Sequence, residues 1–332
     1  MKKLLDSFVY LFWASQVWIL SSCPPIQSLV LNSGVNADRS AILWLKLFCK
    51  VIFRLPFAFF RHIRDKIQRK IVLPRISFPI TSRCTLNCDK CMARVPDIKK
   101  HEDFPIEELL RSLDILLTYV DEIYVLHISG GEAFMHPDLD QLLRYCIASA
   151  KIKKVDIATN GTIIPNENVL KALHDAEAIV RITKYPKKLQ PNVEKLKSVL
   201  EDNRILFMHE VGDYWYDIPT ETILQPGSAK RKFRVCTQRL CLMYFRAVIY
   251  PCSLSVALNE GKLIPDCSDD YIDLRSSVVS TENFNVRWKK LRKKRWLLAC
   301  SYCQGCSYNT PRVPVAVQRT KNKGEEKHEE IT

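Results

Sequence analysis

The segment TSRCTLNCDKC, Thr81 to Cys91, places three cysteines at spacings of four and three residues. Disulfide bonds do not account for it, because three is an odd number and so short a loop gains little from closure. Soft thiolates select zinc or iron–sulfur clusters, and a structural zinc site takes four ligands where this loop supplies three. We therefore interpret the loop as one that holds three irons of a four-iron cluster and leaves the fourth iron open.

The loop stands at the start of a regular alternation of strand and helix patterns. Apolar residues at helical spacing alternate with short apolar runs, which predicts repeated βα units and a parallel sheet. We expect strands at 75–82, 122–128, 154–159, 178–183 and 204–210, and helices at 105–120, 138–149, 166–176 and 191–202. After residue 211 the helical rhythm fails.

The polar and glycine-containing segments of this region lie where the predicted strands end. The cysteine loop follows the first strand, SGGEAF the second, TNGT the third and TKYP the fourth. In parallel sheets ligands bind at the carboxyl ends of the strands. These four segments are therefore predicted to meet at one site.

The order and spacing of these motifs resemble the radical S-adenosylmethionine (radical SAM) superfamily. The likeness rests on C-x3-C-x2-C, on SGGE at Ser129–Glu132 and on TNG at Thr159–Gly161, and it covers residues 75–320. Within that family the chain is similar to the subgroup with a C-terminal SPASM- or twitch-like region. The resemblance implies an α/β fold, a partial (β/α)6 TIM-like barrel with a C-terminal cysteine-rich extension that holds an auxiliary cluster.

The resemblance implies two cofactors, a 4Fe–4S cluster and S-adenosyl-L-methionine. Cys84, Cys88 and Cys91 would hold three irons, and the methionine part of S-adenosylmethionine would chelate the fourth. Reductive cleavage of that cofactor would release a 5′-deoxyadenosyl radical, which abstracts hydrogen from a substrate. The resemblance also implies an electron donor such as flavodoxin or ferredoxin.

The same resemblance assigns the residues that would bind S-adenosylmethionine. Gly130 and Gly131 would let the backbone approach it, because glycine has no side chain. Glu132 would accept a charge-assisted hydrogen bond from its ammonium group. Asn160 and Thr183 are candidates for its ribose.

Two residues depart from the family pattern at this site. Lys90 stands where the family often has an aromatic residue near adenine, so the resemblance assigns no adenine contact. Ala133 replaces the proline of the subgroup. The remaining candidates for the pocket lining are Tyr214, Trp215, Tyr216 and His127, each of which is also explained as a buried, hydrogen-bonded side chain.

A second group of cysteines follows residue 211. LMYFRAVIYP between Cys241 and Cys252 predicts a β-hairpin that brings the two cysteines together, although Arg246 and Ala247 occupy the turn where the subgroup has glycine. The resemblance implies an auxiliary cluster on Cys236, Cys241, Cys252 and Cys303, with Cys300 and Cys306 as alternatives. Thiolate spacing alone leaves a zinc site open. The other cysteines, Cys23, Cys49, Cys146 and Cys267, are interpreted as small buried hydrophobic residues.

The net charge of +14 is concentrated at the N-terminus. Residues 1–75 contain twelve Lys and Arg against three Asp, among many Trp, Phe and Leu. We expect no nucleic-acid partner. The first apolar run is shorter than the roughly 20 residues that cross a bilayer. We expect a basic helical segment on an anionic membrane surface. Two alternatives are an apolar hairpin packed on the core and a lipoprotein signal ending in LSSC.

These observations divide the chain into four parts. They are an apolar and basic helical segment (1–74), a radical SAM core barrel (75–225), an auxiliary-cluster region (226–320) and a disordered charged tail (321–332). We expect a cytoplasmic enzyme, peripheral on the inner face of the membrane in the membrane-surface interpretation. Modification of a peptide or protein is the favoured reaction. The alternatives are a sugar or lipid-linked sugar as substrate, and a zinc-stabilised scaffold without activity.

Overall fold

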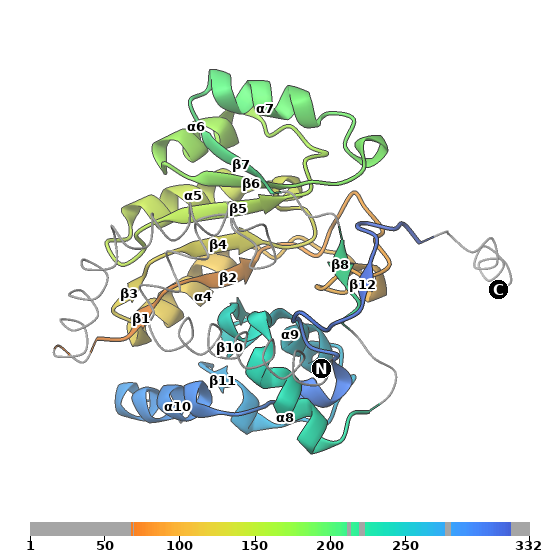
Figure 1. Cartoon of the computed structure of the whole chain (residues 1–332). Helices are drawn as coiled ribbons and strands as arrows, with labels where there is room; N and C mark the ends of the chain where they lie inside the picture. Colours follow the sequence, from red (N-terminus) through yellow and green to blue (C-terminus); the bar gives the residue numbers. More distant parts are fainter. Residues whose placement is uncertain (1–67, 69, 211–213, 219–222, 276–279, 320–332) are drawn as a thin grey trace, which may run out of the picture.

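The protein is described by a computed structural model (Figure 1) that covers residues 68, 70–210, 214–218, 223–275 and 280–319. The predictions for the basic helical segment, for Cys23 and Cys49, for the lipoprotein signal and for the charged tail lie outside these ranges. Among the helices of the described residues, none combines the length and the apolar character that a membrane crossing requires.

The centre of the molecule is an eight-stranded sheet in the order β11-β10-β9-β2-β4-β5-β6-β7. Its six adjacent parallel strands are β9 (Leu242–Phe245), β2 (Ile76–Pro79), β4 (Leu126–Ser129), β5 (Val155–Thr159), β6 (Ile179–Thr183) and β7 (Leu206–Glu210). The predicted α/β partial barrel is confirmed. The sixth parallel strand is β9, which pairs with β2 although it lies beyond the expected domain boundary at residue 225. That division into domains stays a prediction.

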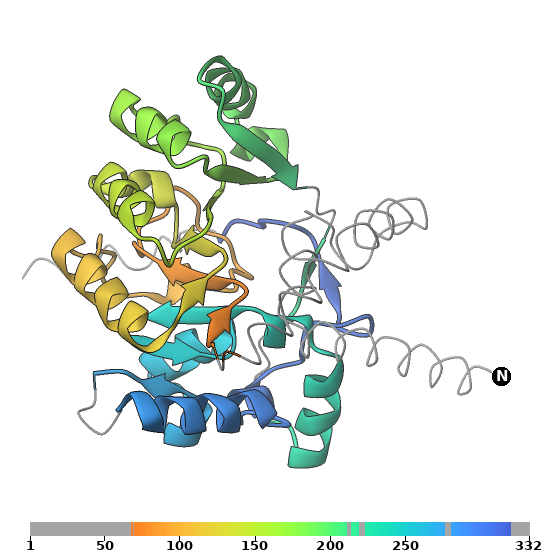
Figure 2. The same cartoon turned by 90° about the vertical axis from the view of Figure 1, so that its left-hand side faces the viewer.

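Four helices cover one face of the parallel strands (Figure 2). They are α4 (Ile106–Tyr119), α5 (Leu139–Ala148), α6 (Glu167–Asp175) and α7 (Val193–Asp202), each close to its predicted range. Apolar residues at spacings of three and four form the buried stripe of each helix, as Leu109, Leu113 and Leu116 do in α4. The Asn166 side chain caps α6 by accepting a hydrogen bond from the Val169 N–H at 3.0 Å.

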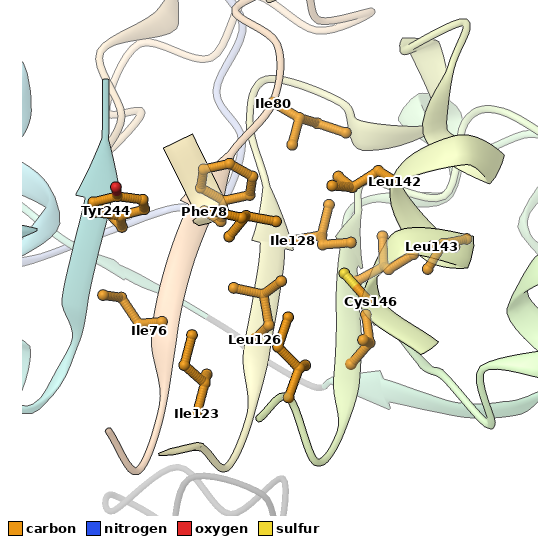
Figure 3. Close-up of a cluster of buried hydrophobic side chains, with 14 of the residues drawn as sticks. Ile76, Phe78, Ile80, Ile123, Leu126, Ile128, Leu142, Leu143, Cys146 and Tyr244 are labelled. Atoms are coloured by element: carbon orange, nitrogen blue, oxygen red, sulfur yellow. The ribbon is translucent and has the colours of Figure 1, made fainter. Parts of the chain in front are cut away.

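The main core lies between these helices and the sheet (Figure 3). Alternation along β2 and into the residue after it buries Ile76, Phe78 and Ile80 on the helix side. Tyr244 of β9 stacks on Phe78 with ring centroids 5.9 Å apart, which joins the C-terminal strand to the same core. Cys146 of α5 is buried there, so its interpretation as a core residue is confirmed.

The predicted strand 122–128 is divided in the structure. Its first part, β3 (Glu122–Ile123), pairs with β1 (Val72–Leu73) in a separate sheet, and its second part is β4. Ile71 and Leu73 are buried in the main core. The packed structure therefore includes residues that the predicted boundary at 74 had assigned to the N-terminal segment.

After residue 211, where the sequence has no regular helical rhythm, the structure still contains helices. The structure has α8 (Pro226–Val235), α9 (Ser253–Glu260) and α10 (Thr281–Lys293) in this part of the chain. The pattern was weak because α10 buries Phe284 and Leu291 but is otherwise rich in Lys and Arg. The remaining elements are β8 (Trp215–Tyr216), β10 (Val248–Tyr250), β11 (Ile272–Asp273), β12 (Arg312–Val313) and the 3-10 turns Val95–Asp97, Ala133–Met135, Lys187–Leu189, Thr237–Leu240, Ser268–Asp270 and Leu298–Tyr302.

The predicted hairpin is present as β9 and β10, paired antiparallel. Its two turn residues, Arg246 and Ala247, have φ of 47° and 59°, the left-handed conformation that hairpin turns of this type need and that glycine or asparagine usually supplies. Tertiary contacts hold the turn: Arg246 pairs with Glu102 at 3.0 Å, and the Ala247 N–H donates to Ser112 Oγ at 3.2 Å.

Candidate functional site

The three-cysteine loop follows β2 at the carboxyl end of the sheet. A backbone turn holds it, in which the Cys91 N–H donates to Cys88 O at 3.3 Å and the Arg94 N–H to Cys91 O at 2.9 Å. Cys88 is buried, and Cys84 and Cys91 are half-buried. Burial raises the pKa of Cys84 to about 11. The thiol is therefore protonated at neutral pH, and a metal ligand at this position would have to release that proton.

The SGGE segment packs directly against the cysteine loop. The Gly131 N–H donates to Thr81 O at 2.9 Å and the Glu132 N–H to Arg83 O at 2.8 Å. A Cβ atom at Gly131 would lie 2.1 Å from Arg83 O, and one at Gly130 would lie 2.5 Å from Thr81 O. The contact between these two loops therefore requires glycine at both positions. The sequence analysis had explained the two glycines only by a close approach of the backbone to a cofactor.

The Glu132 carboxylate is fully buried and bound within the chain. Its Oε1 accepts hydrogen bonds from the Phe134 N–H at 3.1 Å and from Thr159 Oγ1 at 2.8 Å, and its Oε2 accepts one from the Asn160 N–H at 2.7 Å. Burial raises its pKa to about 7 despite these donors. Glu132 therefore ties the SGGE and TNG segments together, and its contact with a cofactor ammonium stays a prediction.

Asn160 faces the cysteine loop from the end of β5. Its Nδ2 donates to Thr85 Oγ1 at 3.0 Å and lies 3.6 Å from Cys84 Sγ. Its Oδ1 accepts from the backbone N–H of Thr162 at 3.0 Å, so the orientation of the amide is set. The structure thus brings Asn160, Glu132 and Cys84 together, as the motif order predicted.

Gln190 is a residue of this site that the sequence pattern did not reveal. Its buried Nε2 donates to Asn160 O at 2.5 Å and to Thr183 O at 2.7 Å, and its Oε1 accepts from the Tyr185 N–H at 2.8 Å. These bonds tie the ends of β5 and β6 together. Thr183, the predicted ribose residue, is held here through its carbonyl, and its role toward a ribose stays a prediction.

Tyr185 also belongs to the site and was missed. Burial raises the pKa of its hydroxyl, and the cysteine thiols and Glu132 raise it further, which places the hydroxyl beside the cysteine loop. Its ring packs edge-on against Trp215 with centroids 5.8 Å apart. The TKYP segment after the fourth strand was the sequence signal that could have revealed Tyr185.

Lys90, which departs from the family pattern, forms an ion pair with Asp217 at 3.1 Å at the same rim.

The face of the sheet opposite the helices carries a buried polar layer. Asp156 of β5 is contacted by Arg75 at 2.8 Å, Arg181 at 2.5 Å and His127 Nδ1 at 2.7 Å. Burial opposes ionisation of Asp156, but these partners hold its pKa well below its ordinary value. Burial, followed by Arg75, lowers the pKa of His127. His127 is therefore a hydrogen-bonded member of this layer.

The tyrosines near residue 215 pack against one another. The rings of Tyr214 and Tyr216 lie 5.6 Å apart, and the Arg312 guanidinium lies 4.1 Å from the centre of the Tyr214 ring. The structure thus gives both tyrosines packing partners, and a role in lining a substrate pocket stays a prediction.

Five C-terminal cysteines surround one cavity, which is otherwise mostly apolar. They are Cys236, Cys252, Cys300, Cys303 and Cys306, and Met92, the neighbour of Cys91, lines the same cavity. The expected ligand Cys241 is not among the lining residues. Burial raises the pKa of Cys241, and both Arg75 of the polar layer and Cys236 of the cavity act on it electrostatically, so Cys241 lies near both.

The cavity thiols accept hydrogen bonds from nearby donors. The Gly305 N–H lies 3.1 Å from Cys303 Sγ, in a turn where glycine has φ 76°. The Cys306 N–H lies 3.4 Å from Cys236 Sγ. N–H groups directed at sulfur tune iron–sulfur clusters, so this donor pattern fits a cluster bound by several of these thiols. Burial raises the pKa of Cys252 to about 11.

In the described part of the chain, no three His, Cys, Asp or Glu side chains are gathered closely enough to hold a single metal ion.

Cys267, interpreted from the sequence as buried, is half-buried at the start of a 3-10 turn instead. That turn carries two acidic side chains, Asp269 and Asp270.

Comparison with known proteins identifies the domain that carries the first cysteine loop. Residues 78–198 match the family model of the radical SAM superfamily. The chain is 32% identical over 114 residues to Fe-coproporphyrin III synthase of Methanosarcina barkeri, covering 34% of this chain and 26% of the relative. It is 32% identical over 94 residues to the antilisterial bacteriocin subtilosin biosynthesis protein AlbA of Bacillus subtilis, covering 28% and 20%.

A third relative is GTP 3′,8-cyclase of Aquifex aeolicus, 31% identical over 137 residues and covering 38% of both chains. The chain thus spans well under half the length of these curated relatives. Among solved structures, anSMEcpe with bound AdoMet covers 72% of this chain and 92% of its own at 11% identity and a TM-score of 0.43. BtrN in complex with AdoMet and 2-DOIA covers 70% and 93% at 12% identity and a TM-score of 0.39. Residues 78–198 therefore form a domain of the radical SAM superfamily, which runs from β2 into α7.

Proposed function

We propose that this protein is a radical SAM enzyme that binds a 4Fe–4S cluster on Cys84, Cys88 and Cys91 and S-adenosylmethionine beside it. The observation that carries the proposal is the convergence of Gly131, Glu132 and Asn160 on the cysteine loop, at distances of 2.8 to 3.6 Å. When bound, the cluster and S-adenosylmethionine would supply a carbon-centred radical by reductive cleavage of the cofactor.

The residues of the chain would shape this site in three ways. The glycine pair allows the SGGE segment to lie against the cysteine loop. Glu132 ties the SGGE segment to the end of β5, and Gln190 ties the end of β5 to that of β6, which would orient the backbone of the TNG segment toward the cofactor. Asn160 and Thr183 would contact its ribose. The Tyr185 and Trp215 rings would exclude water from the same rim.

A second cluster would occupy the C-terminal cavity. Four thiolates hold a typical 4Fe–4S cluster, and we infer that its ligands come from the five that line the cavity. This keeps Cys236, Cys252 and Cys303 of the sequence-based set and replaces Cys241 with Cys300 or Cys306. Because Met92 lines the cavity and adjoins Cys91, such a cluster would lie on the side of the first cysteine loop.

The reaction proposed is hydrogen abstraction from a peptide or protein substrate. Its support is the match to a bacteriocin biosynthesis protein and the presence of a second cysteine site. A reductant is required for radical SAM chemistry, and an electron donor such as flavodoxin or ferredoxin is the proposed partner. An oxygen-sensitive cluster suits a reducing, cytoplasmic compartment.

Anaerobic reconstitution with iron and sulfide tests the proposal. The reduced wild-type protein should convert S-adenosylmethionine into 5′-deoxyadenosine and methionine, measured by chromatography. Cys88→Ala should abolish this conversion, because it removes one iron ligand. Cys267→Ala is the matched control, since that cysteine is half-buried outside both cysteine sites, and it should cleave like the wild type. Undiminished cleavage by Cys88→Ala would refute the assignment of the loop.

A further inference from the structure

The C-terminal end of the described chain returns to the first cysteine loop. We call residues Arg312–Arg319 the C-terminal strap. It starts as β12, which pairs antiparallel with β8 beside the orange segment that carries the cysteines (Figure 1). It ends at the loop itself, where the Asp89 N–H donates to Val317 O at 2.7 Å and the Arg319 N–H donates to Asn87 O at 2.8 Å. Cys88 and Gln318 thus face each other in an antiparallel bridge.

The Gln318 side chain binds the loop through both ends of its amide. Its Oε1 accepts a hydrogen bond from the Asn87 N–H at 2.7 Å. Its Nε2 donates to Cys88 Sγ at 3.1 Å and to Ala316 O at 2.7 Å. Because a backbone N–H can only donate, the contact with Asn87 sets which end of the amide is oxygen. The NH2 group must therefore face the sulfur.

Neighbouring contacts hold the strap in this position. Arg319 pairs with Asp97 at 2.7 Å and with Asp89 at 3.3 Å, so its two ion pairs lie on either side of Cys91 in the sequence. Ala316 is buried and has φ 51°, a left-handed conformation that is unfavourable for a residue with a side chain. Such backbone strain persists only where the surroundings impose it, and it is frequent beside functional sites.

We propose that Gln318 is a positioning residue for the loop cluster, which donates an N–H hydrogen bond to the sulfur of Cys88 and thereby raises the reduction potential of the cluster. The physical reason is that reduction adds electron density to the sulfur ligands, and an N–H donor stabilises the electron-rich state. The inference rests on the proposed function, because it needs a cluster on this loop. Cys84 has a comparable donor in Asn160 Nδ2, whose distance of 3.6 Å makes it the weaker contact.

The isosteric change Gln318→Glu separates this role from simple support of the loop. A glutamate oxygen still accepts from the Asn87 N–H, so the strap stays attached, whereas the N–H donor to Cys88 Sγ is lost and a negative charge is added. Gln318→Leu removes both contacts without adding charge. Val317→Ala is the control, because that side chain is exposed while its carbonyl still accepts from Asp89.

The experiment is a redox titration of the reconstituted full-length protein, followed by electron paramagnetic resonance. The signal that changes on addition of S-adenosylmethionine identifies the loop cluster. We expect its midpoint potential to fall in Gln318→Leu, to fall further in Gln318→Glu and to stay unchanged in Val317→Ala. Wild-type potential in a Gln318→Glu protein with full iron content would overturn the inference.

Two other outcomes are distinguishable. If Gln318→Leu fails to take up iron, the midpoint potential of Gln318→Glu still tests the inference, because Gln318→Glu keeps the contact with the Asn87 N–H. A wild-type protein that takes up no iron on the loop would contradict the proposed function, and this inference with it.

Discussion

At the scale of single residues, Glu132 is a carboxyl group whose burial in the site carries an electrostatic cost. The group is fully buried, and burial raises its pKa from 4.5 to about 7. A raised carboxyl pKa means that the folded state binds the proton more tightly than the unfolded state. The stabilisation by protonated Glu132 is therefore complete below about pH 4.5 and lost as the pH rises through 7.

This gives a pH-dependent prediction for the metal-free protein. Between pH 5 and pH 8 the free energy of unfolding of the wild type should fall by about 3 kcal/mol relative to that of Glu132→Gln, at roughly 1.4 kcal/mol per pKa unit. Urea unfolding at several pH values measures it. Glu108→Gln, at an exposed position of α4, is the control and should follow the wild-type curve. Parallel curves for the wild type and Glu132→Gln would show that the carboxyl titrates alike in both states.

A second prediction at this scale concerns the ligands of the C-terminal cavity. Cys252 lines the cavity and Cys241 does not. Cys252→Ala should therefore lose about four irons per chain, the content of one 4Fe–4S cluster, whereas Cys241→Ala should keep the wild-type iron content. Iron analysis after reconstitution measures both variants. Equal losses in the two variants would restore Cys241 to the ligand set.

At the scale of elements, the β9–β10 hairpin shows how tertiary contacts override turn preference. Ala247 adopts φ 59° and is buried, with its N–H bonded to Ser112 Oγ. A β-branched residue is disfavoured in this conformation. We expect Ala247→Val to lower the free energy of unfolding by about 2 kcal/mol. Ala257→Val, in α9, is the matched control with a small effect. Denaturant titration of the metal-free protein measures both, and equal stability of the two variants would contradict a strained turn.

At the scale of the whole molecule, the boundary between the N-terminal segment and the packed core can be tested. Ile71 and Leu73 are buried in the main core, and β1 pairs with β3. A chain that starts at Gln68 keeps these contacts, whereas one that starts at Arg75 loses two buried side chains worth about 3 kcal/mol or more together. The first should remain folded with cofactor cleavage intact, and the second should unfold at a lower urea concentration.

The same truncation tests the predicted membrane surface. Each basic residue near an anionic bilayer contributes about 1 kcal/mol to binding. The full chain should sediment with anionic liposomes at low salt and be partly released by high salt, while the chain that starts at Gln68 stays in the supernatant. Aggregation of the Gln68 chain, with no liposome binding by the full chain, would favour the packed-hairpin alternative.

Local patterns in the sequence determined much of this protein. Periodic apolar residues determined the strands and helices between residues 75 and 210, and the spacing of Cys84, Cys88 and Cys91 predicted a metal-binding loop and pointed to the radical SAM domain that residues 78–198 match. Both signals are readable because the residues that cooperate are close in the chain. The helices after residue 211 escaped the same method, since α10 buries few apolar residues along a basic helix.

Only the tertiary structure decided the contacts between distant residues. It placed β9 beside β2, gathered Cys252 and Cys300 around one cavity, and brought Gln318 to Cys88 across 230 positions of sequence. A single half-buried glutamine has no periodicity and no required spacing, so nothing in the chain marks it before folding. Its role follows from hydrogen-bond geometry alone, because an amide pinned by the Asn87 N–H can present only its donor to the sulfur.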